Sequence, residues 1–200
     1  MAIRACLFDV GGVLEITPAT GFRHRWAARL LRESGEFERL LEELWSPGAT
    51  GALTLEQIEH RTAQVLNLTR ATVRDLMNDA WVEYLGTLNQ ELATFVRNLR
   101  PRYKTGIVSN SFVGAREREQ DAYGFHELFD VIVYSHEVGY LKPDPRIYRL
   151  ACEQLAVSPD DVVFVDDLDA NVEAARAVGM TGIVFADNDQ VLSELAELLR

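Results

Sequence analysis

Five short apolar runs, each followed by polar or glycine-containing residues, have the length and β-branched content of buried strands. They span Ile3–Phe8, Thr105–Val108, Val131–Tyr134, Val162–Val165 and Gly182–Phe185. Helical patterns lie between and after the later runs, at Gly114–Tyr123, Arg146–Leu155, Ala170–Val178 and Val191–Leu199. Alternating strands and helices are typical of a parallel sheet that is covered on both faces. The pattern therefore predicts an α/β fold, a three-layer doubly wound parallel sheet.

The interval between the first and second runs is close to a hundred residues long and contains no convincing strand. Thr54 and Gln57 form a capping box ahead of an apolar helix face, and residues 73–85 keep helical spacing over more than three turns. A further helix at residues 92–99 ends before Pro101 and leads into the second strand. We expect a core formed by residues 1–14 and 88–200, with a helical insertion at residues 15–87.

The charge balance narrows the range of partners. The chain has 20 Lys and Arg residues against 31 Asp and Glu residues, a formal net charge of −11. A nucleic-acid partner is not expected, because duplex binding depends on a basic face. A membrane partner is not expected either, because no apolar stretch approaches the length of a bilayer span. The first residues lack the pattern of a secretory signal, so a cytoplasmic location is expected. The oligomeric state stays open.

Polar residues follow three of the predicted strands at the points where they end. Asp9 follows the first strand, Ser109 and Asn110 follow the second, and Asp166 and Asp167 follow the fourth. In an open parallel sheet, ligands bind beyond the carboxyl ends of the strands, so these residues should converge. Carboxylates that meet at close quarters repel one another or recruit a hard cation, and we expect magnesium.

A phosphoryl group is the ligand that best suits such a site. Lys142 follows the third strand and can supply positive charge, while Ser109 and the glycine-rich turn after Asp9 supply hydrogen-bond donors. An aspartate can act as a nucleophile and form an aspartyl-phosphate, and Asp9 is the natural candidate.

These residues lie in four segments that together resemble the ordered motifs of the haloacid dehalogenase-like (HAD) hydrolase superfamily, a resemblance that spans nearly the whole chain. The segments are 8–14, 107–110, 142–148 and 163–167. The resemblance implies a Rossmann-like core with a small helical cap, residues 15–87, inserted after the first motif.

The resemblance also implies a role for each site residue. Asp9 would be the nucleophile and a magnesium ligand, and Asp167 a direct ligand. Asp166 would act from the outer shell, although the two acids can exchange these roles. Ser109 and Asn110 would hold the phosphoryl oxygens. Lys142 would neutralise charge on Asp9 and on the transferring group.

One position departs from the phosphatase pattern. Most phosphatases of this superfamily carry a second Asp two residues after the nucleophile, where this chain has Gly11. The main-chain carbonyl of Gly11 can still bind the metal, but the position has no acid–base side chain. General acid–base catalysis is worth about 10²–10⁴-fold, so its loss slows turnover without abolishing it. Glu15 or His24 is our hypothesis for a substitute proton donor.

The predicted function is magnesium-dependent hydrolysis of a small phosphorylated metabolite through an aspartyl-phosphate. Two alternatives stay open. A haloacid dehalogenase needs no proton donor at position 11, but it would leave Asp166 and Asp167 as unpaired, mutually repelling acids. A phosphate-binding module with low turnover would also be consistent with Gly11.

Overall fold

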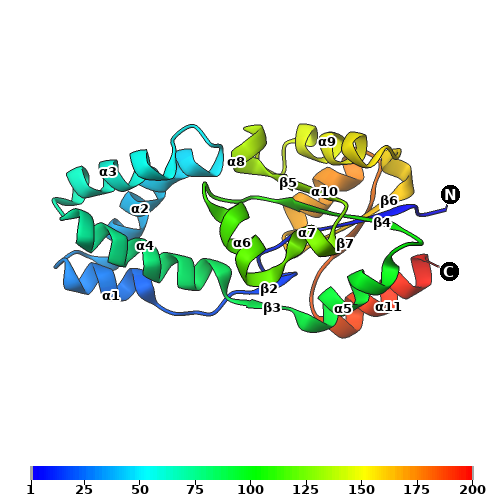
Figure 1. The fold of residues 1–200 in the computed structure, drawn as a ribbon, viewed down its shortest axis with the longest axis horizontal. Helices are drawn as coiled ribbons and strands as arrows, with labels where there is room; N and C mark the ends of the chain where they lie inside the picture. The colour runs from blue at the N-terminus through cyan, green and yellow to red at the C-terminus, as the bar shows by residue number, and fades with distance from the viewer. Residues whose placement is uncertain (1, 200) are drawn as a thin grey trace.

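The structure, a computed structural model, describes residues 2–199 and is built around one five-stranded parallel sheet (Figure 1). The strands run in the order β5-β4-β1-β6-β7, so β1 is central and pairs with both β4 and β6. Their bounds are β1 Ala5–Phe8, β4 Lys104–Ser109, β5 Val131–Tyr134, β6 Val162–Asp166 and β7 Thr181–Val184. All five predicted strands are present, and the predicted α/β class is confirmed.

Helices cover both faces of the sheet, as predicted. Helices α9 and α10 pack on one face, where Leu7, Val108 and Phe164 form part of an apolar cluster. Helices α5 and α11 lie together against the opposite face, where Phe8, Ile107 and Val165 belong to a second cluster. The helix bounds are α5 Gln90–Leu99, α6 Ala115–Tyr123, α7 Phe125–Leu128, α8 Ser135–Val138, α9 Pro145–Leu155, α10 Asp169–Ala177 and α11 Asn188–Leu198.

The long interval is helical, as the spacing predicted, and its four helices gather at the end of the molecule opposite both termini (Figure 1). They are α1 Phe22–Arg29, α2 Ser34–Ala49, α3 Leu55–Leu66 and α4 Arg70–Leu85. The capping box at Thr54 and Gln57 is present. Phe22, Trp26, Phe37 and Leu76 form an apolar cluster of their own, apart from the clusters on the sheet.

The expectation that this interval holds no strand is wrong at its two ends. Two short strands, β2 (Glu15–Ile16) and β3 (Thr87–Leu88), pair antiparallel where the chain leaves and re-enters the sheet domain. Each has only two residues, too few to show a periodic apolar pattern. The boundaries at 14/15 and 87/88 stay a prediction, and they fall at this ribbon.

The four helices α1 to α4, which we call the cap helices, contact the sheet domain directly as well as through the ribbon. The Val113 amide donates to the Gly48 carbonyl, and the Ser135 hydroxyl donates to the Ala49 carbonyl at 2.7 Å. None of the helices in residues 2–199 combines the length and apolar character that a membrane crossing needs.

Asn89 joins the ribbon to two helices. Its buried side-chain amide donates to the Val13 carbonyl at 2.9 Å and to Asn188 at 2.8 Å, and its oxygen accepts from the Leu92 amide at the start of α5. Asn89→Ala removes these bonds and leaves the buried Val13 carbonyl without its side-chain donor. We expect the free energy of unfolding to fall by about 2 kcal/mol in urea titrations.

Thr94→Ala on the exposed face of α5 is the control, and we expect it to change the free energy of unfolding by less than about 0.5 kcal/mol. Equal effects of the two variants would show that Asn89 does not anchor this junction.

Candidate active site

Three neighbouring strands bring their polar ends to one edge of the sheet. Asp9 directly follows β1, Ser109 ends β4 and Asp166 ends β6. Asp9, Asp166 and Asp167 each offer a carboxylate oxygen within 4.8 Å of the others. Residues more than 150 positions apart therefore meet in one cluster, as their places at strand ends predicted.

Lys142 reaches this cluster from the loop between α8 and α9. Its ammonium nitrogen lies 2.6 Å from Asp9 Oδ1 and 2.6 Å from Asp166 Oδ2. The lysine is 3% exposed and Asp166 is fully buried, so water screens these charges little. Burial of these charges is tolerated because each lies against an opposite charge.

The two adjacent acids have different surroundings. Asp166 accepts hydrogen bonds from the Leu168 amide at 2.9 Å and the Asn171 side chain at 3.0 Å, in addition to its contact with Lys142. Asp167 is exposed, and its carboxylate lies over Gly12. A Cβ at Gly12 would be 2.6 Å from Asp167 Oδ2, so only glycine leaves room for the acid there.

Burial, opposed by Lys142 and assisted by the nearby charge of Asp166, raises the pKa of Asp9 to about 6. Partial burial and the charge of Asp166 also raise the pKa of Asp167. Asp9 and Asp167, whose pKa values are raised, lie with Asp166 next to one ammonium, and a hard divalent cation would satisfy this set of carboxylate donors. The residues present therefore fit a magnesium ion.

Ser109 and Asn110 line a cavity of about 400 Å³ that begins at Gly11 and extends under the cap helices. The Asn110 side chain binds the loop that carries Lys142: its oxygen accepts from the Lys142 amide at 2.7 Å, and its nitrogen donates to the Lys142 carbonyl at 2.9 Å. Asn110 thus holds Lys142 in place, and its contact with a phosphoryl oxygen stays a prediction.

The two hypothetical proton donors lie in different places. His24 is exposed on α1, where its Nδ1 lies 3.0 Å from the Ser34 hydroxyl, outside the residues that line the cavity. Glu15 is 1% exposed, lines the cavity, and lies beside Gly11. A Cβ at Gly11 would be 3.9 Å from Glu15 Oε2. Burial raises the pKa of Glu15 to about 7.

Sequence reasoning missed a buried acid close to the site. Glu119 on α6 is 1% exposed and accepts a hydrogen bond from the Tyr134 hydroxyl at the end of β5. Tyr84 on α4 lies near the same carboxyl, and burial raises the pKa of Glu119 to about 7. The local sequence Ala115–Tyr123 reads as a solvated polar helix, so only the distant tyrosines mark Glu119 as buried.

Comparisons with known proteins agree with this geometry. A family model described as haloacid dehalogenase-like hydrolase matches residues 3–179. The chain is 42% identical to a phosphatase of Mycobacterium tuberculosis over 99% of this chain and 96% of that protein. It is 26% identical to (S)-2-haloacid dehalogenase 1 of a Pseudomonas species over 98% of this chain and 95% of that protein.

The chain also resembles part of a longer protein in sequence, and a solved structure in its fold. The chain is 27% identical to bifunctional epoxide hydrolase 2 of Sus scrofa over 99% of its length, but spans only 39% of that relative. Among solved structures, a HAD family enzyme of Bacteroides thetaiotaomicron in complex with magnesium and inorganic phosphate superposes with a TM-score of 0.80. The superposition covers 96% of this chain and 99% of the other at 17% identity, and it supports the fold.

Glu119 makes stability depend on pH. Its pKa rises from 4.5 in an unfolded chain to about 7 in the fold, so the folded state binds more protons between these values. The free energy of unfolding therefore falls as pH rises through this window. Between about pH 5 and pH 8, we expect the free energy of unfolding of the wild type to fall by roughly 2–3 kcal/mol more than that of Glu119→Gln, as measured by urea unfolding.

Glu117→Gln, an exposed position on the same helix, is the control and should keep the wild-type slope. Identical slopes for wild type and Glu119→Gln would show that the buried carboxyl does not titrate as described.

Proposed function

The chain belongs to the haloacid dehalogenase-like hydrolase family, and we propose that it is a magnesium-dependent phosphatase acting through an aspartyl-phosphate on Asp9. The observation that carries this proposal is the cluster of Asp9, Asp166 and Asp167 within 4.8 Å beside the buried ammonium of Lys142. The 42% identity to a protein named as a phosphatase supports the same reaction class. The proposed substrate is a small phosphorylated metabolite.

Asp9 is oriented for attack by its hydrogen bonds. Its Oδ1 accepts from the Val10 amide at 2.7 Å and contacts Lys142, which leaves Oδ2 as the attacking oxygen. The Oδ2–phosphorus bond forms while the bond from phosphorus to the leaving oxygen breaks. Water then cleaves the aspartyl-phosphate, releases inorganic phosphate and restores the carboxylate.

Asp9, the Gly11 carbonyl and Asp167 would hold the magnesium ion directly. We assign Asp166 to the outer shell, because its oxygens already accept from Lys142, Leu168 and Asn171, whereas Asp167 is exposed. Bound magnesium supplies positive charge that offsets the negative charge of the phosphoryl group.

The positive charge of Lys142 lies next to Asp9, to which the phosphoryl group would be transferred. It offsets charge on Asp9 and on the phosphoryl oxygens, and Asn110 fixes its backbone. Ser109, buried at the end of β4, would donate to a phosphoryl oxygen, and Asn110 would do so next to it.

Glu15 is the proposed source of the proton that Gly11 cannot supply. Its carboxyl occupies the space next to position 11, and a group with a pKa of about 7 is protonated in a large fraction of molecules at neutral pH. Its Oε2 accepts from the Thr17 hydroxyl at 2.7 Å, and its Oε1 is buried without a hydrogen-bond partner in the structure. The protonated carboxyl would protonate the leaving oxygen, and the carboxylate would then take a proton from water.

Asp9→Asn removes the nucleophile while keeping the size of the side chain. We expect phosphate release from p-nitrophenyl phosphate to require Mg²⁺, to stop with EDTA, and to fall at least about 10³-fold in this variant. Asp160→Asn, an exposed acid on the turn before β6, is the control and should keep wild-type activity. Circular dichroism of the Asp9 variant checks that it folds.

Two results would contradict the phosphatase proposal. Halide release from a 2-haloacid without metal would indicate a dehalogenase. Tight binding of a metal fluoride phosphate mimic, with no turnover over a broad panel of phosphates, would indicate a phosphate-binding protein.

Glu15→Gln tests the proton donor. We expect about a 10²-fold loss of kcat for ethyl phosphate, whose leaving oxygen needs a proton, and a loss of less than about threefold for p-nitrophenyl phosphate. The basic limb of the kcat–pH profile should also disappear. His24→Gln serves as the control and should behave as wild type with both substrates.

A second variant separates chemistry from structure. Gly11 has space for a Cβ, so Gly11→Asp in the Glu15→Gln background should restore turnover of ethyl phosphate. Equal losses on both substrates, with no restoration by Gly11→Asp, would assign Glu15 a structural role only.

A further inference from the structure

The cavity that extends from the proposed phosphoryl site is lined by a continuous series of aromatic rings. Phe22 stacks on Trp45 with ring centroids 6.5 Å apart, and Trp45 lies 6.3 Å from Phe112. Phe112 meets Trp81 at 5.8 Å, and Trp81 meets Tyr84 at 5.1 Å, both edge to face. Met77, Ala80 and Ala49 line the same cavity. We call these eight side chains the aromatic wall.

The aromatic wall begins at the phosphoryl site itself. Phe112 follows Asn110 by two residues in the loop after β4 and inserts between the cap helices. A Cβ at Gly48 would be 2.4 Å from the Phe112 ring, so glycine at this position of α2 lets the ring approach. A substrate whose phosphate binds at Ser109 and Asn110 therefore places its organic group against aromatic carbon.

Three polar side chains beside the aromatic wall, Arg23, Glu83 and Thr17, are already paired within the protein. Arg23 lies 3.0 Å from Glu83 in an ion pair, and Glu83 also accepts from the Thr20 amide at 3.0 Å. Thr17 donates to Glu15. A sugar or a nucleobase that left water for this cavity would replace only a few of its hydrogen bonds, which disfavours both.

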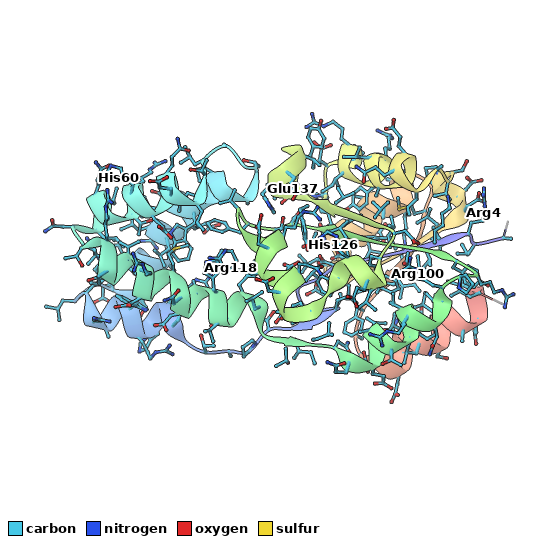
Figure 2. All side chains as sticks on the ribbon, viewed as in Figure 1. Arg4, His60, Arg100, Arg118, His126 and Glu137 are labelled. Carbon is cyan, nitrogen blue, oxygen red and sulfur yellow. The ribbon has the colours of Figure 1, made fainter. Side chains whose placement is uncertain are left out.

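A second phosphate or a carboxylate on the substrate would also lack a free cationic side chain to pair with among the described residues that line this cavity. Arg23, the arginine that lines the cavity, is held by Glu83. Arg118 projects from α6 toward α4, but its guanidinium lies 4.1 Å from the centre of the Trp81 ring and donates to the Gly114 carbonyl at 2.9 Å (Figure 2). Both cations are therefore engaged with the protein.

We propose that the substrate is the phosphomonoester of an apolar alcohol, aromatic or hydrocarbon-rich, whose carbon skeleton lies against the aromatic wall. This inference rests on the proposed phosphatase function and adds the substrate class. A cavity of about 400 Å³ is within the range of about 300–1,000 Å³ that small organic ligands occupy. Apolar carbon gains free energy by leaving water for such a surface without needing polar partners.

Primary alkyl esters test the proposal, because their leaving groups differ little in reactivity. With Mg²⁺ present, we expect kcat/KM for 2-naphthylmethyl phosphate to exceed that for glucose 6-phosphate and for ethyl phosphate by at least about tenfold. Equal or higher values for glucose 6-phosphate would overturn the apolar substrate class while the phosphatase proposal stands.

Trp81→Ala removes the central ring of the aromatic wall. We expect it to lower kcat/KM for 2-naphthylmethyl phosphate at least about tenfold and that for ethyl phosphate less than about threefold. Val82→Ala on the exposed face of the same helix is the matched control. Ala80→Gln, which fills the cavity without removing a buried ring, is a second variant with the same expected selectivity, used if Trp81→Ala does not fold.

Binding of 2-naphthylmethylphosphonate separates this proposal from the reaction itself. The phosphonate cannot be hydrolysed, and we expect it to quench tryptophan fluorescence with a Kd at least about tenfold below that of ethylphosphonate. That result, with no phosphate released from any ester, would reject the phosphatase and keep the apolar site. Equal Kd values for the two phosphonates would reject the apolar site whatever the turnover.

Discussion

The buried ammonium of Lys142 is the interaction on which the site depends. Its nitrogen lies 2.6 Å from both Asp9 and Asp166, where water screens charges poorly. Removing one member of such a group leaves the others buried and uncompensated, at a cost of several kcal/mol. The loop after β1, the end of β6 and the loop before α9 must therefore keep their relative positions. Asn110 and Asn171 fix two of these positions by hydrogen bonds to the Lys142 backbone and to Asp166.

The parts of this arrangement that sequence reasoning predicted are those that a parallel sheet dictates. Strands buried on both faces read as continuous apolar runs, and the residue that ends each run lies at the ligand-binding edge. Asp9, Ser109 and Asp166 could be placed together for that reason alone. Lys142 lies in a loop, and only its place in a recognised motif distinguished it from an exposed lysine.

The parts that sequence reasoning missed depend on contacts between distant segments. The ribbon of β2 and β3 has two residues a side, so its pairing leaves no periodic trace in the sequence. Glu119 lies among charged residues on α6, and its burial is set by Tyr134 and Tyr84 from elsewhere in the chain. Gly48 is a similar case. The need for glycine at this position is evident only in the structure, where the Phe112 ring lies against it.

The missed ribbon is also what places Glu15. This residue belongs to β2, and its carboxyl fits because Gly86, just before β3, has no side chain; a Cβ there would be 1.7 Å from Glu15 Oε1. An acid at position 11 would be held by the same loop as Asp9. Glu15 is held instead by the pairing of the two strands that join the cap helices to the sheet domain. The position of the proposed proton donor therefore depends on how the cap helices are attached, whereas the positions of Asp9 and Asp166 depend on the sheet.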